Sequence, residues 1–290
     1  MHSTESTTTA IVSVRPVTIP APAGRGVDLQ VRVTAPVTGR DLPVILFSHG
    51  FGQSMDAYQP LAEHWAGHGF VVVQPTHLDF PPLGVGPDDS RTPEIWRFRV
   101  QDMVLALNHL DLLEASVPGL AGRIDRSRVI AAGHSYGGQT AGMLLGARIV
   151  GSDEDLSDAR VTAGVLLTTA GTGGDDLTPF AAEHFPFMSP DFSTMTTPAL
   201  VIAGDQDRSP LTVRDPDWFA DPYHLSPGSK TLLTIFGAEH TLGGIVGANH
   251  TQTTDEDPQR VALVQRVTTA YLRGELTGEH VGDLGKLESR

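Results

Sequence analysis

The chain contains no cysteine among its 290 residues. Without thiols it has no disulfide framework, no thiolate zinc site, no iron–sulfur cluster and no cysteine nucleophile. The absence of thiols leaves the redox compartment open. No covalent staple is needed at this length, because a folded chain of about 300 residues buries roughly 75% of its unfolded surface.

Positive charge is scarce. The chain has 20 Lys and Arg against 34 Asp and Glu, so its formal net charge is −14. Nucleic acids and anionic membranes attract clustered basic residues. The densest basic groups here are short and are expected to be solvated surface: Arg97 with Arg99, and Arg123 with Arg126 and Arg128. We therefore expect no nucleic-acid partner and no membrane partner, and the negative field disfavours strongly anionic substrates.

Long apolar runs are also missing. No stretch reaches about 18 consecutive apolar residues, so the sequence predicts no transmembrane helix. Residues 1–9 are rich in Ser and Thr and carry no basic n-region, and the first apolar run is interrupted by Arg15 and Pro16. A signal peptide is therefore not expected. The predicted location is cytoplasmic, with a secreted mature form whose leader has been removed as the alternative.

The sequence is rich in short apolar segments that alternate with helical ones. Eight segments bounded by Gly, Pro or Asp are predicted strands: 11–19, 27–35, 43–47, 70–74, 128–132, 161–168, 198–203 and 230–236. At least four segments have helical periodicity: 58–67, 93–115, 137–149 and 258–274. The first two strands suit an antiparallel hairpin at the sheet edge. The alternation predicts an α/β fold, a mostly parallel eight-stranded sheet with helices on both faces.

The predicted organisation is one domain, 11–274, between a mobile N-terminal tail, 1–10, and a mobile C-terminal tail, 275–290. Residues 171–197 form an insertion that is too short to be a domain, and we expect a small cap-like excursion there. Its aromatic residues either line a pocket or anchor the segment to the body of the protein; they are Phe180, Phe185, Phe187 and Phe192.

One motif carries chemistry. The predicted strand 128–132 runs into Gly133-His-Ser135-Tyr-Gly137 and then into a predicted helix. Gly-x-Ser-x-Gly in this context is typical of the nucleophile elbow, a strained turn in which the glycines leave room for close packing. The amides of the helix N-terminus then face the place where negative charge develops. The pattern predicts Ser135 as a nucleophile rather than an ordinary turn serine.

A serine nucleophile needs a base that removes its proton. In this architecture the acid and then the histidine follow the serine along the chain. His240 comes soon after the predicted strand 230–236, at the sheet edge where ligands bind in open α/β sheets, and is the predicted base. The other downstream histidines are His184, His224 and His250.

The acid that orients this base is expected after the strand 198–203, in the turn Gly204-Asp-Gln-Asp207. Asp207 is the predicted acid, because the loop must travel beyond the strand end before a carboxylate can face His240. Asp205 is the alternative and is better suited to capping the turn. Asp175 and Asp176, after the preceding strand, are further candidates.

An oxyanion hole needs two backbone donors. One is expected to be the amide of Tyr136, the residue after the nucleophile, and the other an amide of the loop after the strand 43–47. That loop reads Ser48-His-Gly-Phe-Gly, and we predict the amide of Phe51 as the second donor. His49 and His134 flank these donors and are expected to hold the two loops together.

Four motifs make residues 43–273 resemble the α/β-hydrolase superfamily: Ser48-His-Gly-Phe-Gly, Gly133-His-Ser-Tyr-Gly-Gly, Gly204-Asp-Gln-Asp and Gly237-Ala-Glu-His. The chain looks most like the branch that holds bacterial dienelactone hydrolases, chlorophyllase-like proteins and cutinase-type polyester hydrolases. The resemblance implies an α/β-hydrolase fold, with Ser135 as nucleophile, Asp207 as acid, His240 as base, and Phe51 and Tyr136 as the oxyanion-hole residues.

The chain departs from the narrower members of that branch in two respects. Dienelactone hydrolases commonly use a cysteine where this chain has Ser135. Secreted polyester hydrolases usually have a leader and a C-terminal disulfide, and the sequence shows neither.

The expected function is hydrolysis of a neutral, small-molecule carboxylic ester through a Ser-His-Asp triad and an acyl-enzyme, with no cofactor and no metal. A lipase, thioesterase, amidase or polyester hydrolase would use the same residues. A non-catalytic ligand-binding protein on the same fold is the alternative of another class. The oligomeric state does not follow from the sequence.

Two further sets of residues have alternative interpretations. Trp96, Trp218 and His184 are candidate substrate contacts, although buried aromatic residues are more often part of the core. His64 and His68 stand four residues apart on a predicted helix or just past its end, and are more typical of a surface than of a zinc site.

Overall fold

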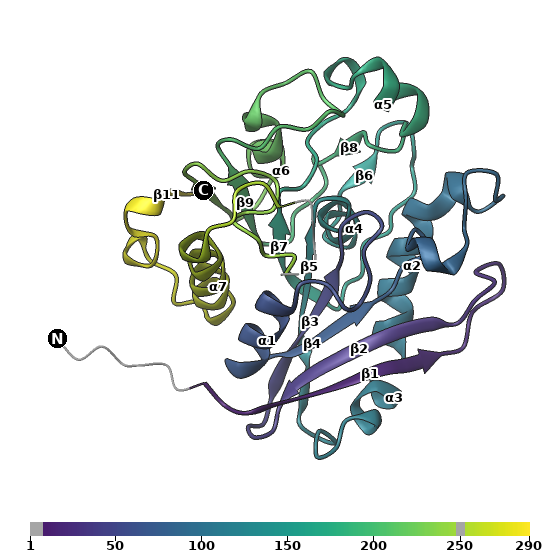
Figure 1. Cartoon of the computed structure of the whole chain (residues 1–290), viewed down its shortest axis with the longest axis vertical. Coiled ribbons are helices and arrows are strands. Elements are labelled where there is room, and N and C mark those ends of the chain that lie inside the picture. The colour runs from purple at the N-terminus through teal and green to yellow at the C-terminus, as the bar shows by residue number, and fades with distance from the viewer. Residues whose placement is uncertain (1–7, 248–252) are drawn as a thin grey trace.

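The computed structural model describes residues 8–247 and 253–290, and a nine-stranded sheet runs through its centre (Figure 1). Its strands lie in the order β1-β2-β4-β3-β5-β7-β9-β10-β11. Their bounds are β1 Ile11–Ile19, β2 Leu29–Pro36, β3 Leu42–Ser48, β4 Val71–Pro75, β5 Ile124–His134, β7 Val161–Leu167, β9 Ala199–Gly204, β10 Lys230–Ile235 and β11 Gly285–Ser289. The strands from β4 to β10 in this order run parallel, while β1, β2 and β11 are antiparallel to their neighbours.

The predicted helices are present with two differences. The helices are α1 Gln59–Gly67, α2 Ile95–Asn108, α3 Leu110–Ser116, α4 Tyr136–Leu144, α5 Pro179–His184, α6 Asp221–Leu225 and α7 Pro258–Arg273. The helix predicted over 137–149 ends at Leu144, because Gly146 takes a left-handed conformation (φ 107°), and Arg148–Ile149 form a short strand instead. The single helix predicted over 93–115 is in fact two, α2 and α3, which meet at His109. Residues next to α7 determine where it begins and ends. The Asp257 side chain accepts hydrogen bonds from the first-turn amides, and Gly274 takes a left-handed conformation after the last turn.

Helices cover both faces of the sheet. Alternate residues of β3 point to opposite sides: Val44 and Leu46 belong to one apolar cluster, and Ile45 and Phe47 to the other. The first cluster includes side chains of α2, α3 and α4, and the second those of α1 and α7. Figure 1 shows these two groups on either side of the strands. The α/β-hydrolase fold predicted from the sequence is confirmed.

The sheet has one strand more than predicted, and the extra strand comes from the segment expected to be a C-terminal tail. β11 pairs antiparallel with β10, with Leu287 opposite Leu233. Its sequence, Gly-Lys-Leu-Glu-Ser, contains too few apolar residues to predict a strand. As an edge strand it is held by one neighbour, so its pairing depends on β10 rather than on its own pattern.

The insertion 171–197 contains a short 3-10 helix (Gly174–Asp176), α5 and the strand β8 Pro190–Asp191, which pairs with β6 Arg148–Ile149. The side chain of Thr178 caps α5 by accepting a hydrogen bond from the Ala181 amide. Ala181, Met188 and Phe192 are buried in the main apolar cluster, so the segment is anchored to the body. The predicted N-terminal tail lies outside the described residues as far as residue 7.

The carboxyl ends of the parallel strands lie along one edge of the sheet. Ser48 at the end of β3 pairs in register with Gly133 of β5, and Ile235 of β10 pairs with Gly204 of β9. The loops that follow these strands therefore gather at one place, as open α/β sheets require of a ligand site. Among the described residues, no helix is long and apolar enough to cross a membrane.

Candidate active site

Ser135 stands on a strained turn between β5 and α4. Its φ of 56° and ψ of −121° are unusual for a residue with a side chain. The flanking glycines allow this geometry. A Cβ atom at Gly133 would lie 2.1 Å from the Gly137 carbonyl oxygen, and one at Gly137 would lie 2.0 Å from the Ser48 carbonyl oxygen. Any larger residue would push the turn away from α4 and from the loop after β3.

Three side chains from three loops form a hydrogen-bonded chain at this edge. The Oγ of Ser135 lies 2.8 Å from Nε2 of His240, and Nδ1 of His240 lies 2.9 Å and 3.1 Å from the two carboxylate oxygens of Asp207. The His240 side chain is 40% exposed while Asp207 is 0% exposed. The histidine thus faces solvent, and the aspartate that it contacts does not.

Burial raises the pKa of Asp207, although the hydrogen bond and charge of His240 act in the opposite direction. Asp205, the alternative acid, has another partner, since its carboxylate accepts the amide hydrogen of Gly237 at 2.7 Å. Asp176 pairs with Arg214 at 3.1 Å, and Asp175 is exposed.

The backbone amides of Phe51 and Tyr136 have no hydrogen-bond acceptor among the described residues. Tyr136 is the first residue of α4, where a backbone N–H has no partner within the helix. In the loop after β3, the Gly50 amide donates to the Tyr58 hydroxyl at 3.0 Å and the Gly52 amide to Asp79 at 2.9 Å. No acceptor within the described part of the chain takes the Phe51 amide between them.

His134 and His49 hold the loops around these amides. Nδ1 of His134 lies 2.8 Å from the Tyr58 hydroxyl, and its Nε2 lies 2.8 Å from the His240 carbonyl oxygen. Burial lowers the pKa of His134 to about 3, with a further contribution from nearby His240. His134 therefore stays neutral and donates from Nε2 to the loop that carries His240. Nε2 of His49 accepts the amide hydrogen of His77 at 3.1 Å.

A second Ser-His-Asp array lies close to the first. The Oγ of Ser48 is 3.0 Å from Nε2 of His77, whose Nδ1 is 3.0 Å from Asp102. All three residues are almost completely buried, and no substrate could reach this hydroxyl. The distances within this array match those of a catalytic triad, but all of its side chains lie in the protein interior.

The candidate substrate contacts have different surroundings. Trp218 is buried, and its indole N–H donates to the Thr172 carbonyl at 2.7 Å; Trp96 is likewise part of the main apolar cluster. Both therefore serve as core side chains here. His184 is exposed on α5 and stacks on Phe180 with ring centres 4.5 Å apart.

Other aromatic rings lie around Ser135 and His240, and of these only Phe219 was not already a candidate from the sequence. The ring of Phe219 is 5.6 Å from that of His240. On the other side a row of aromatic contacts leads from Phe51 to Tyr136 at 6.4 Å and from Tyr136 to Phe187 of the insertion at 5.5 Å. Phe51 is 66% exposed, so this row presents apolar surface beside Ser135.

Several buried polar residues around the site were also missed. Arg99 was expected on the surface and is fully buried, 0% exposed, beneath the loop after β3. Its helical spacing from Met103, four residues on and also buried, was the available signal. Asp79 and Asp255, which bind loop amides near Phe51 and His240, lie in loops without a recognisable motif.

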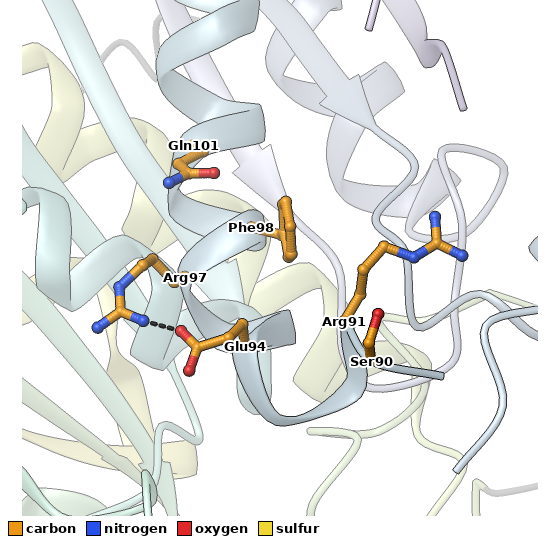
Figure 2. A pocket seen from close by; sticks show the side chains of 6 residues that line it. All are labelled: Ser90, Arg91, Glu94, Arg97, Phe98 and Gln101. Carbon is orange, nitrogen blue, oxygen red and sulfur yellow. Dashed lines mark ion pairs between the residues drawn. The ribbon is translucent and has the colours of Figure 1, made fainter. Parts of the chain in front are cut away.

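A separate hollow of about 280 Å³, shown in Figure 2, lies beside the start of α2. It is lined by Ser90, Arg91, Glu94, Arg97, Phe98 and Gln101. Its arginines are already paired, Arg91 with Asp89 and Arg97 with Glu94 and Glu154. None of the three triad residues lines it.

Across residues 8–247 and 253–290, no cluster of three or more His, Asp or Glu side chains could hold a metal ion. His64 and His68 stack on each other with ring centres 4.0 Å apart. His224 is exposed on α6, and His250 lies outside the described residues.

Known proteins resemble this chain in both sequence and structure. Residues 17–149 match the family model described as Chlorophyllase. Chlorophyllase-1, chloroplastic, of Citrus sinensis is 32% identical over 128 residues, which cover 44% of this chain and 31% of that protein. A platelet-activating factor acetylhydrolase of Canis lupus familiaris is 24% identical over 286 residues, which cover 82% of this chain and 58% of that protein.

Among solved structures, a Pyrobaculum calidifontis esterase has a TM-score of 0.62 and 19% identity, over 93% of this chain and 87% of that one. Together with the sheet order and the turn at Ser135, this structural similarity shows that the chain has an α/β-hydrolase fold. The resemblance to the chlorophyllase-like branch is confirmed for residues 17–149, a range that includes Phe51 and Ser135 but ends before Asp207 and His240. The chain matches 31% of the length of the citrus chlorophyllase.

Proposed function

We propose that the protein hydrolyses neutral carboxylic esters, with Ser135 as nucleophile, His240 as general base and Asp207 as the acid that orients it. The observation that carries the proposal is the continuous hydrogen-bonded chain from Ser135 through His240 to Asp207, with the histidine open to solvent and the aspartate buried. The relatives named as chlorophyllase, acetylhydrolase and esterase support ester hydrolysis as the reaction class.

The reaction follows from this order of groups. Ser135 Oγ bonds to the ester carbonyl carbon as its proton passes to Nε2 of His240, and the resulting oxyanion accepts hydrogen bonds from the Phe51 and Tyr136 amides. The bond to the alcohol oxygen breaks as His240 returns the proton to it, which leaves an acylated Ser135. Water then attacks the acyl carbon, gives a proton to His240, and the bond to Ser135 breaks with that proton returning to the serine.

The surroundings of Ser135 favour an ester with an apolar acyl or alcohol group. The row of rings from Phe51 through Tyr136 to Phe187 supplies apolar contact area, and the net charge of −14 disfavours a strongly anionic substrate. Lipase, thioesterase, amidase and polyester hydrolase activities would use the same triad. A hydrolysis panel of acyl chain lengths, lactones, thioesters, amides and polyester oligomers separates them.

The decisive test compares wild type with Ser135→Ala on p-nitrophenyl acetate. Loss of the nucleophile should lower kcat by at least about 10⁴-fold, since removal of a triad member leaves only oxyanion binding and proximity. Ser127→Ala is the matched control, because it removes an exposed hydroxyl near the start of β5, the strand whose other end leads to Ser135, and should leave fluorophosphonate labelling of Ser135 intact. Wild-type turnover in Ser135→Ala, or folded wild type that the probe does not label, would instead support a non-catalytic binding protein.

A further inference from the structure

Arg99 of α2 is a fully buried arginine whose nitrogens bind the loops and the helix α4 around Ser135. Its Nη1 donates to Asp79 at 2.6 Å and its Nε to the Thr140 hydroxyl at 3.1 Å. Its Nη2 donates to the Ser48 hydroxyl at 3.2 Å and to the His49 carbonyl oxygen. The planar guanidinium fork makes this set of bonds possible, and a lysine could not reproduce it.

Arg99 and Asp79 hold the loop on both sides of Phe51. Arg99 binds the carbonyl oxygen of His49 before it, and Asp79 accepts the amide hydrogen of Gly52 after it. Burial alone would raise the pKa of Asp79, but the charge of Arg99, with the nearby histidines and the Gly52 amide, lowers it to about 2. The pair therefore stays ionised, and the Phe51 amide between its two attachment points is left free.

The same guanidinium also contacts the segment that carries the second donor. Its central carbon lies 4.4 Å from the centre of the Tyr136 ring, a cation–π contact. The Thr140 hydroxyl that accepts from Nε belongs to α4, one turn after Tyr136, and donates to the Tyr136 carbonyl at 3.1 Å. One side chain thus connects the loop of Phe51 with the helix of Tyr136.

Fold stability alone does not explain why Arg99 and Asp79 are buried here. A buried ion pair often stabilises a fold no more than apolar side chains of the same size. Arg25 and Asp102 form a comparable buried pair at 2.7 Å that does not contact residues 49–52. Both ion pairs are buried, but only Arg99 and Asp79 bind the backbone beside Phe51. Variants of Arg25 therefore serve as a control for variants of Arg99.

The geometry points to Arg99 and Asp79 as positioning residues that fix the Phe51 and Tyr136 amides relative to each other and so preorganise the oxyanion hole. This inference rests on the proposed esterase function. Neither side chain touches the substrate; they act through the backbone that does. Preorganised donors stabilise the oxyanion without reorganising during the reaction, and displacement by about 1 Å can cost on the order of 10²-fold in rate.

The test measures kcat and KM for p-nitrophenyl acetate, and Ki for phenylboronic acid, whose tetrahedral serine adduct places an oxygen in the hole. Arg99→Met and Asp79→Asn should lower kcat by about ten- to hundred-fold with KM changed less than about threefold, and raise Ki in parallel. Arg99→Lys should fall between Arg99→Met and wild type. Arg25→Met should lower thermal stability while kcat and Ki stay within about twofold of wild type.

If Arg99→Met does not fold, Thr140→Val replaces only the acceptor of Nε and should still lower kcat by about two- to tenfold. Unchanged kcat and Ki in the folded Arg99, Asp79 or Thr140 variants overturns the inference. So does an equal fall in Arg25→Met, since the effect would then report general destabilisation. Failure of the proposed function looks different, because wild type itself would then lack turnover dependent on Ser135.

Discussion

Asp205 and Asp207 lie in one turn after β9, yet they face different groups. Asp207 points inward to Nδ1 of His240, and Asp205 accepts the Gly237 amide at the start of the loop that carries this histidine. Two aspartates in the same turn therefore have different partners: one contacts the histidine side chain, and the other holds the backbone of the loop that carries it. The two residues form a natural pair for testing which carboxylate orients the base.

Asp207→Asn should lower kcat/KM by about 10⁴-fold, because an amide facing His240 favours the tautomer that cannot accept the serine proton. Asp205→Asn keeps an oxygen that accepts from Gly237 and should stay within about threefold of wild type. Steady-state hydrolysis of p-nitrophenyl acetate by both variants checks this. An equal loss in the two, or a larger loss in Asp205→Asn, would reverse the assignment of the acid.

The loop between β10 and α7 carries His240, and the carboxylate of Asp255 holds this loop in shape. Asp255 accepts hydrogen bonds from the Glu239 amide at 2.9 Å, the Thr241 hydroxyl at 3.1 Å and the Gly243 amide at 3.1 Å. These donors lie on both sides of His240. Asp255 is also buried beside Arg260 at 3.6 Å, so the loop is held from inside the protein.

Asp255→Ala should lower the free energy of unfolding by about 1–3 kcal/mol, since it leaves buried donors without their acceptor. It should also lower kcat, because His240 loses its fixed position over Ser135. Glu256→Ala, at the exposed neighbouring position, should change stability by less than about 0.5 kcal/mol. Urea unfolding and p-nitrophenyl acetate turnover measure both effects. Unchanged kcat in folded Asp255→Ala would show that the loop holds its shape without this carboxylate.

At the scale of the whole molecule, several fully or partly buried histidines are kept neutral. Burial lowers the pKa of His134 to about 3 and that of His64 to about 4, and it lowers the pKa of His49 well below its ordinary value. The unfolded chain binds protons at these positions below about pH 6.5 while the folded chain does not. Stability contributed by these groups is therefore present at neutral pH and is lost as the pH falls.

We expect the free energy of unfolding to fall between pH 7 and pH 5, with each such histidine adding up to about 1.4 kcal/mol per pH unit to the slope. Burial raises the pKa of Asp102 to about 6, which opposes the trend at one site. Urea unfolding curves at several pH values measure the slope. The variant His134→Gln should make the slope shallower, because it removes one of these lowered pKa values, and a wild-type stability that rises on acidification would contradict this account.

The features that could be predicted from the sequence are those whose residues lie close together in the chain. The elbow at Ser135 was recognisable because its strand, glycines and helix are contiguous. β11 was not, since its pairing depends on β10, and Arg99 was expected at the surface because its buried partners come from distant loops. Trp96 and Trp218 were selected as possible pocket residues from residue type alone, and only packing distinguishes a core ring from Phe219 or Phe187 beside the site.

By itself the sequence determined the fold class and the identity and order of nucleophile, acid and base candidates, because periodicity and turn-forming glycines act over a few residues. The absence of cysteine likewise left serine as the candidate nucleophile in the elbow. Only the tertiary structure decided which aspartate meets His240, which Ser-His-Asp array is open to solvent, and what Arg99 holds. Those answers depend on groups far apart in the chain that meet when the sheet brings the carboxyl ends of its strands together.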